Sequence, residues 1–294
     1  MADSLIAISI FSGLATALAY GVQEAVAKKL LSDREPRPVM WLWMAAGLPF
    51  AAAAALLASG GFPAAWLTGG TWAFSLLGTL CWAIAFDRYY AGVKAGRVSV
   101  MAPLNSLSAI LLVGLGVLFL QAEITAGIVA SVILASAGTA LSAISERKAS
   151  LRENRGFPET KYLAISIPFF AIAGLCYIIV MRRIGIFWEF AIDRAIFVSI
   201  LAVAYRSELA GSLKMQMKNL PAGLFLALVG LNVFAALASS FGIVNGLPAL
   251  VIPLASTGAA FTALIGIFLY RERLSPAQKV GILLVASSVA AASA

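Results

Sequence analysis

Long, uninterrupted apolar runs constrain the fold of this chain more than any other feature. Examples are AILLVGLGVLFL at 109–120 and FLALVGLNVFAALA at 225–238, in which polar and apolar residues do not alternate. In hydrocarbon every backbone amide must be hydrogen-bonded within the protein, so a spanning chain forms helices or a closed barrel, and barrel strands alternate in polarity. Only 12% of the residues are charged, against about 25% in soluble domains. The sequence therefore predicts an all-α membrane protein.

The apolar runs have the length of membrane spans. A bilayer core of about 30 Å needs about 20 apolar residues in a helix. On that scale we predict ten transmembrane helices, near residues 5–27, 39–58, 71–91, 98–119, 124–144, 162–181, 187–205, 220–241, 248–269 and 277–293. Short segments with charges, glycine and proline separate them, so consecutive helices should be antiparallel neighbours.

The basic residues indicate how the helices are oriented. The net charge is +8, and 18 of the 21 Lys and Arg residues follow odd-numbered spans. This asymmetry is typical of membrane topology rather than of nucleic-acid binding, and it places both termini on the external side of the membrane. We therefore expect a multi-pass protein of the bacterial cytoplasmic (inner) membrane. Its expected partners are the lipid bilayer and a small-molecule substrate, and it should be a monomer or a weak homodimer.

The chain divides into two halves of five spans. The predicted units are an N-terminal repeat at 1–145, a cytoplasmic connector at 146–161 and a C-terminal repeat at 162–294. Laying residues 91–144 on 241–294 without a gap pairs Pro103 with Pro253 and Ser106 with Ser256. Because each half has an odd number of spans, the second half should enter the membrane upside down. Inverted repeats are typical of secondary transporters, whose substrate site lies near the midplane.

The ends of both halves resemble a known repeat. The stretches YYAGVKAGRVSVMAPLNSLSAILLVGLGVLFLQAEITAG and FGIVNGLPALVIPLASTGAAFTALIGIFLYRERLSPAQK are similar to the EamA-type repeat of the drug/metabolite transporter superfamily. Pro103 and Pro253 match its proline, and Glu123 and Glu272 match its loop glutamate. Within the superfamily the chain most resembles the YddG-type exporters of aromatic amino acids. The resemblance implies a secondary exporter with a pore lined by spans one, three, four, six, eight and nine.

Residues for enzymatic chemistry are scarce. The sequence has no histidine, no GxxxxGK[ST] phosphate loop and no Ser-His arrangement. Cys81 and Cys176 lie singly within apolar runs, which is typical of small buried hydrophobic residues. We therefore expect no enzyme activity, no catalytic residue, no cofactor and no metal site.

Polar and aromatic residues within the spans are the candidate substrate-binding residues. Polar side chains are costly in hydrocarbon and often mark a cavity, although a serine can also bond its own helix. The predicted set is Tyr20, Gln23, Trp82, Phe86, Tyr89, Asn105, Ser106, Tyr177, Asn232, Ser239 and Ser256. The inverted positions of Pro103 and Pro253 suggest hinges for two opposite gates, with static kinks as the alternative.

The charged residues within the spans are interpreted as structural rather than as substrate-binding. Glu24 precedes Lys28 by four residues, the favourable order for an ion pair on a helix. Glu189, Asp193 and Arg194 suggest a structural cluster at the outer interface. The leading hypothesis is an exporter of aromatic or hydrophobic amino acids. A multidrug or organic-cation exporter is the alternative, and it would need an unpaired carboxylate deep in the cavity. A structural or sensory membrane protein is the rival from another class.

Overall fold

A computed structural model describes residues 2–59, 61–96, 98–105, 107–121, 159–218, 220–270 and 275–292, with a few isolated residues between 126 and 141. In this part of the chain the secondary structure is helical throughout. The helices are α1 (Ala2–Leu31), α2 (Pro36–Ser59), the short 3-10 helix η1 (Ala64–Leu67), α3 (Thr71–Ala95), α4 (Val98–Asn105), α5 (Leu107–Leu120), α7 (Glu159–Ile184), α8 (Ile186–Ala204), α9 (Arg206–Lys218), α10 (Ala222–Asn245), α11 (Pro248–Ser256), α12 (Gly258–Tyr270) and α13 (Pro276–Ala292).

Four of the described helices are long and apolar enough to cross a membrane. They contain the spans Ser4–Leu31, Pro36–Ala58, Lys161–Ile184 and Ala222–Asn245. The predicted all-α membrane class is therefore confirmed. The fifth predicted span, 124–144, lies largely outside the described residues, and the count of ten remains a prediction.

Apolar side chains cover much of the surface of the bundle, and a set of polar side chains is buried among its apolar core. Large apolar side chains point outward, as at Phe11 (77% exposed), Leu57 (88%) and Phe268 (82%). Polar side chains are instead buried between helices, among them Gln23, Thr79, Asp87, Glu189, Asp193, Arg194 and Asn232. An apolar perimeter suits a bundle surrounded by lipid, where buried polar groups mark a cavity or pathway.

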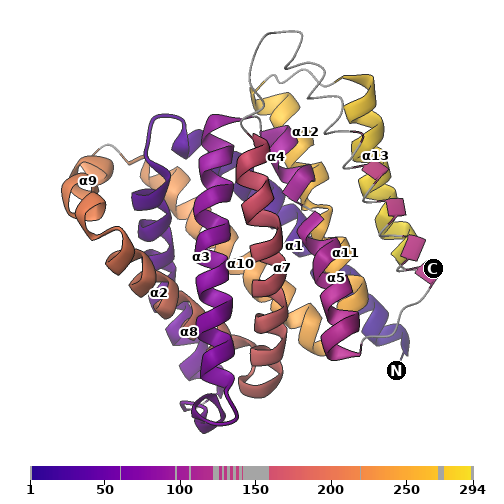
Figure 1. Cartoon of the computed structure of the whole chain (residues 1–294), viewed down its shortest axis with the longest axis horizontal. Helices are drawn as coiled ribbons and strands as arrows, with labels where there is room; N and C mark the ends of the chain where they lie inside the picture. Colours follow the sequence, from indigo (N-terminus) through magenta and orange to yellow (C-terminus); the bar gives the residue numbers. More distant parts are fainter. Residues whose placement is uncertain are drawn as a thin grey trace.

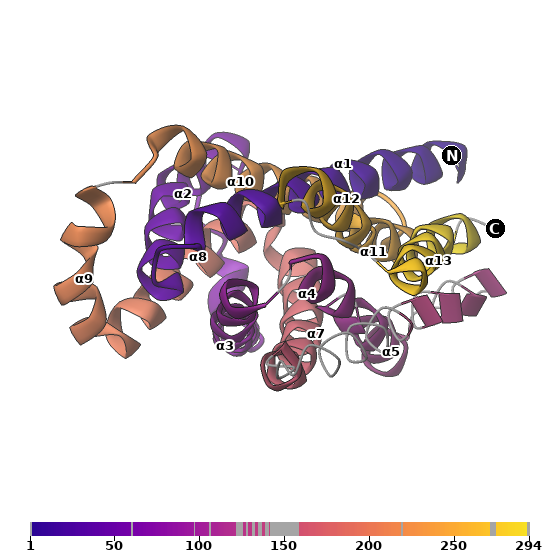
Figure 2. The ribbon, with the colours of Figure 1, turned by 90° about the horizontal axis from the view of Figure 1, so that it is seen from above.

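The helices pack in two related sets. α1 packs along α10 and against α11 and α12, and α7 packs along α3 and against α4 and α5. α3 and α7 lie side by side in both views (Figures 1 and 2). A Cβ atom at Gly78 of α3 would lie 2.8 Å from the Cβ of Cys176, so the small residue permits this close approach. Cys81 and Cys176 are both buried free thiols, as expected.

The ninth predicted span is divided into two helices, α11 and α12. Thr257 separates them, and its hydroxyl and its amide both donate to the carbonyl of Leu254, at 2.7 and 3.1 Å. These bonds to the third preceding residue tighten the turn and interrupt the α-helical ladder. The fourth predicted span is likewise present as two helices, α4 and α5, with Ser106 between them outside the described residues.

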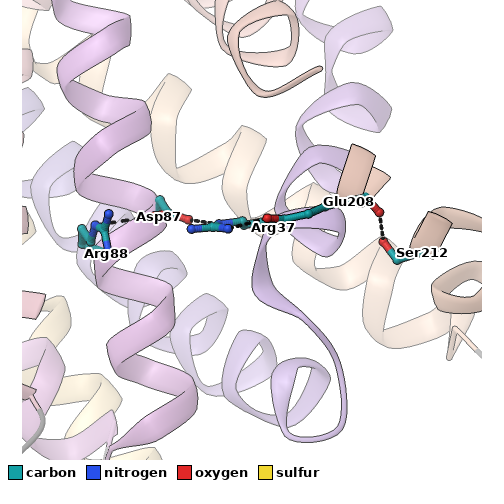
Figure 3. A network of polar contacts seen from close by, with 5 residues as sticks. All are labelled: Arg37, Asp87, Arg88, Glu208 and Ser212. Carbon is teal, nitrogen blue, oxygen red and sulfur yellow. Dashed lines mark hydrogen bonds and ion pairs between the residues drawn. The ribbon is translucent and has the colours of Figure 1, made fainter. Parts of the chain in front are cut away.

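The predicted connection at 206–219 contains a further helix, α9, which lies at the edge of the bundle (Figure 1). Arg37, at the start of α2, connects α9 to the bundle, as Figure 3 shows. The Arg37 Nε donates to Asp87 of α3 at 2.7 Å, and its Nη1 donates to Glu208 of α9 at 2.8 Å. Its guanidinium also lies 4.2 Å from the ring centroid of Tyr205. Arg37 therefore links three helices.

Candidate functional site

A cavity of about 370 Å³ lies at the centre of the helix bundle. Its walls come from α1, α3, α4, α5, α7, α8, α10, α11 and α12, so both halves of the chain contribute. This volume falls within the range of about 300–1,000 Å³ that is usual for small-molecule sites. The lining combines aromatic rings with a small number of polar groups, which is the composition expected for an amphipathic ligand.

Most of the substrate-binding residues predicted from the sequence line this cavity. They are Tyr20, Gln23, Trp82, Phe86, Tyr89, Asn105, Tyr177, Asn232 and Ser239. Ser106 lies outside the described residues, as does the side chain of Ser256. The nine residues therefore lie around one cavity. That they bind a substrate remains a prediction. α8 also contributes to the wall, through Glu189, Phe190 and Asp193, although span seven is absent from the pore that the family resemblance implies.

Aromatic rings form one wall of the cavity. Trp82 on α3 lies 4.8 Å from Phe86 and 6.0 Å from Tyr177 of α7, measured between ring centroids. Tyr89 lies 6.0 Å from Phe170, another lining residue of α7. Trp82, Phe86 and Tyr89 share one face of α3 because they recur at intervals of three to four residues. The wall can therefore pack against a flat apolar group and present π faces to a cation.

A chain of hydrogen bonds runs along the cavity wall from Arg194 to Glu24. Arg194 donates to the Oδ1 of Asn232, whose Nδ2 donates to the Oε1 of Gln23 at 3.2 Å. The Nε2 of Gln23 donates to the Tyr90 hydroxyl at 3.1 Å, and that hydroxyl donates to the Oε1 of Glu24 at 2.9 Å. We call these five residues the Arg194–Glu24 relay. Every bond in it donates in the same direction, from the guanidinium toward the carboxylate.

The charged cluster on α8 faces the bundle interior, and its predicted depth near the outer interface remains a prediction. Asp193 accepts hydrogen bonds from the hydroxyls of Thr79 at 2.7 Å and Tyr177 at 2.5 Å. Arg194 is 0% exposed, and its guanidinium lies 4.4 Å from the ring centroid of Phe190. Arg183 donates to the carbonyl of Gly69 at 2.6 Å.

Two glutamates, Glu24 and Glu189, line the cavity although neither was among the predicted substrate-binding residues. None of the ion pairs between described residues joins Glu24 to Lys28, whose ammonium donates to the carbonyl of Val93 at 2.7 Å. Glu24 lines the cavity, and its buried Oε2 has no hydrogen-bond partner in the described structure. Glu189 lines it as well. The i,i+4 spacing of Glu189 and Asp193 was the available signal, because it places both carboxylates on one face of α8.

The predicted hinge prolines lie beside the cavity. Pro103 is in α4, whose neighbouring residues Ala102 and Asn105 line the wall, and Pro253 is in α11, between the lining residues Ile252 and Ala255. A bend at either proline would therefore change the shape of the cavity. Among the residues that the structure describes, no group of three or more potential metal ligands occurs.

Comparisons with known proteins agree with this architecture. Residues 7–144 match the model of the EamA-like transporter family, which supports the resemblance to the drug/metabolite transporter superfamily. The crystal structure of one protein superposes on this chain with a TM-score of 0.70 at 16% sequence identity. The superposition covers 99% of this chain and 98% of the other. The two chains therefore share a fold. No curated protein matches this chain significantly.

Proposed function

We propose that this chain is a secondary transporter that exports small amphipathic metabolites by alternating access, with aromatic and hydrophobic amino acids as the first candidates. The observation that carries the proposal is the central cavity, which is built from both halves and lined by aromatic rings and amides. The match of residues 7–144 to a transporter family points to the same class of function. In this proposal the protein lies in the bacterial inner membrane with both termini outside.

The packing of the helices supports two inverted repeats. If the halves correspond, α1 is the counterpart of α7, α3 of α10, and the pair α4 and α5 of the pair α11 and α12. The contacts of α1 with α10, α11 and α12 then correspond to those of α7 with α3, α4 and α5, and α2 packs against its own counterpart α8. A twofold relation of this kind is common in alternating-access transporters, because the same rearrangement can then open either face.

Not all corresponding contacts are equal, and the difference between the α4–α12 and α5–α11 contacts suggests which state the structure represents. α4 packs extensively against α12, whereas the counterpart contact between α5 and α11 is much smaller. The cavity is therefore more tightly sealed at the α4–α12 end. Under the positive-inside orientation this is the cytoplasmic end, and the state is outward-facing. Bending at Pro103 and Pro253 would open the α4–α12 end of the cavity and close the α5–α11 end.

Uptake into liposomes tests the proposed function. The purified protein would be reconstituted, and entry of radiolabelled phenylalanine, tryptophan, leucine and glutamate would be followed with and without a pH gradient. We expect saturable uptake of the aromatic and hydrophobic amino acids above the rate of protein-free vesicles, and little uptake of glutamate. Rates equal to those of protein-free vesicles for the whole panel, under both conditions, would contradict amino-acid transport.

A further inference from the structure

The cavity contains carboxylates in excess of cationic groups. Glu24, Glu189 and Asp193 belong to its lining, and no Lys or Arg is among the described lining residues. Arg194 lies nearby but is 0% exposed. With every group ionised, these four side chains carry a formal excess of two negative charges. A buried carboxylate without a cationic partner takes up a proton instead of remaining charged, so a positively charged occupant would stabilise the ionised form of these groups.

The three carboxylates differ in how far they are already satisfied. Asp193 accepts hydrogen bonds from Thr79 of α3 and Tyr177 of α7, and it therefore links these two helices to α8. Glu24 uses its Oε1 to accept the relay bond from Tyr90, but its Oε2 has no partner in the described structure. Half of the hydrogen-bonding capacity of Glu24 is therefore unused in the described structure, on an oxygen that is itself buried.

Glu189 is the least satisfied of the three. It is 6% exposed, and its side chain makes no hydrogen bond or ion pair with any described residue. It nevertheless lines the cavity. A buried carboxylate without a protein partner that faces a cavity is suited to accept a charge-assisted hydrogen bond from a ligand.

We propose that Glu189 forms a subsite for a positively charged nitrogen, with Glu24 as a second carboxylate of the same cavity, so that the substrate is an amine or organic cation with an aromatic or apolar body. The aromatic wall, which includes Trp82 and Tyr89, supplies π faces for the cation and a surface for its apolar body, and Tyr20 adds a further ring to the lining. The lining offers no cationic partner for a free carboxylate group. Amines without a carboxylate should therefore bind more tightly than the matching amino acids. This inference rests on the proposed transport function for its biological meaning, but not for its test.

Binding to the full-length protein in nanodiscs tests the subsite directly. Four ligands share a phenyl ring on a short chain and differ in charge: phenethylamine is a cation, phenylalanine a zwitterion, 2-phenylethanol neutral and 3-phenylpropionate an anion. We expect phenethylamine to bind most tightly and 3-phenylpropionate most weakly. Glu189→Gln should weaken phenethylamine binding by about tenfold or more, and Glu24→Gln by a smaller factor, with little change for 2-phenylethanol.

Glu35→Gln is the matched control, because Glu35 is an exposed carboxylate that pairs with Lys94 far from the cavity lining. It should leave phenethylamine binding unchanged. Equal affinity for phenethylamine and 2-phenylethanol in the wild type, or phenethylamine binding that is unaffected by both cavity substitutions, would overturn the subsite. Folding of each variant is checked by its elution as a monodisperse peak and by retained 2-phenylethanol binding.

A transport arm separates this inference from the proposed function. If phenethylamine binds in a Glu189-dependent manner but does not cross liposomes, the subsite stands and transport is refuted. If phenylalanine crosses liposomes while phenethylamine neither binds nor crosses, transport stands and the cation subsite is refuted. If both amine and amino acid depend on Glu189, the ammonium group is what the subsite recognises in either source.

Discussion

Gly47 on α2 provides the space that the buried Arg194 guanidinium occupies. A Cβ atom at this position would lie 3.0 Å from the Cζ of Arg194 and still closer to its Nη1, and 3.5 Å from the Cγ2 of Val233. The Arg194 side chain has little freedom to retreat, because it is fully buried, stacks on Phe190 and donates to Asn232. Gly47→Ala should therefore displace the guanidinium and disturb the first bond of the Arg194–Glu24 relay.

The expected cost follows from these contacts. Overpacking a buried site typically costs about 1–3 kcal/mol, and weakening a hydrogen bond to a charged group costs about 1.5–3 kcal/mol. The improved helix propensity of alanine offsets roughly 0.5–1 kcal/mol. We expect a net destabilisation of about 2–4 kcal/mol, measured as a lower melting temperature by tryptophan fluorescence in detergent.

Gly230→Ala is the matched control for this substitution. Gly230 is also inside a long helix, α10, but a Cβ atom there would meet nothing within 4 Å. It should melt at or above the wild-type temperature. In an Arg194→Met background, where the guanidinium is absent, Gly47→Ala should cost much less than in the wild type. If Gly47→Ala melted like Gly230→Ala, or if its cost were the same in both backgrounds, the proposed clash with the guanidinium would be refuted.

Three further changes test other parts of the structure. Trp82→Ala should lower the transport rate up to about tenfold at unchanged folded yield, because one aromatic contact to the substrate is lost; an unchanged rate in the liposome assay would remove Trp82 from the site. Pro103→Ala and Pro253→Ala should shift the ratio of inward-open to outward-open states about five- to a hundred-fold in opposite directions, as measured by spin-label distances, and identical wild-type distributions would make both prolines static kinks. Arg37→Gln should destabilise the fold by about 1–3 kcal/mol because it leaves the buried Asp87 without its closest ion-pair partner; an unchanged melting temperature would show that this contact is not formed in solution.

The helical membrane class follows from the sequence because hydrocarbon permits so few structures. The same constraint locates the cavity residues, since an amide such as Asn105 or Asn232 within an apolar helix needs a partner that its own helix cannot provide. The spacing of Trp82, Phe86 and Tyr89 then places their rings on one helix face. Nine of the eleven predicted residues do line one cavity, which no property of a single helix could have guaranteed.

The charged residues could not be placed in the same way. Spacing shows that Glu189 and Asp193 share a face of α8, but it does not show whether that face meets water, lipid or a cavity. Arg194 is the next residue and points to a different neighbour, where Gly47 of α2 happens to leave room for it. The interruption at Thr257 was also missed, because a threonine inside an apolar helix usually bonds to its own backbone without breaking the helix.

The single direction of the Arg194–Glu24 relay has an evolutionary consequence. Each amide in it accepts with its oxygen and donates with its nitrogen, so reversing one amide would set donor against donor at one side and acceptor against acceptor at the other. Losing the guanidinium would leave the oxygen of Asn232 without its donor. In related proteins, positions 194, 232 and 23 are therefore expected to change together, and a homologue with an apolar residue at position 194 should seldom retain both amides.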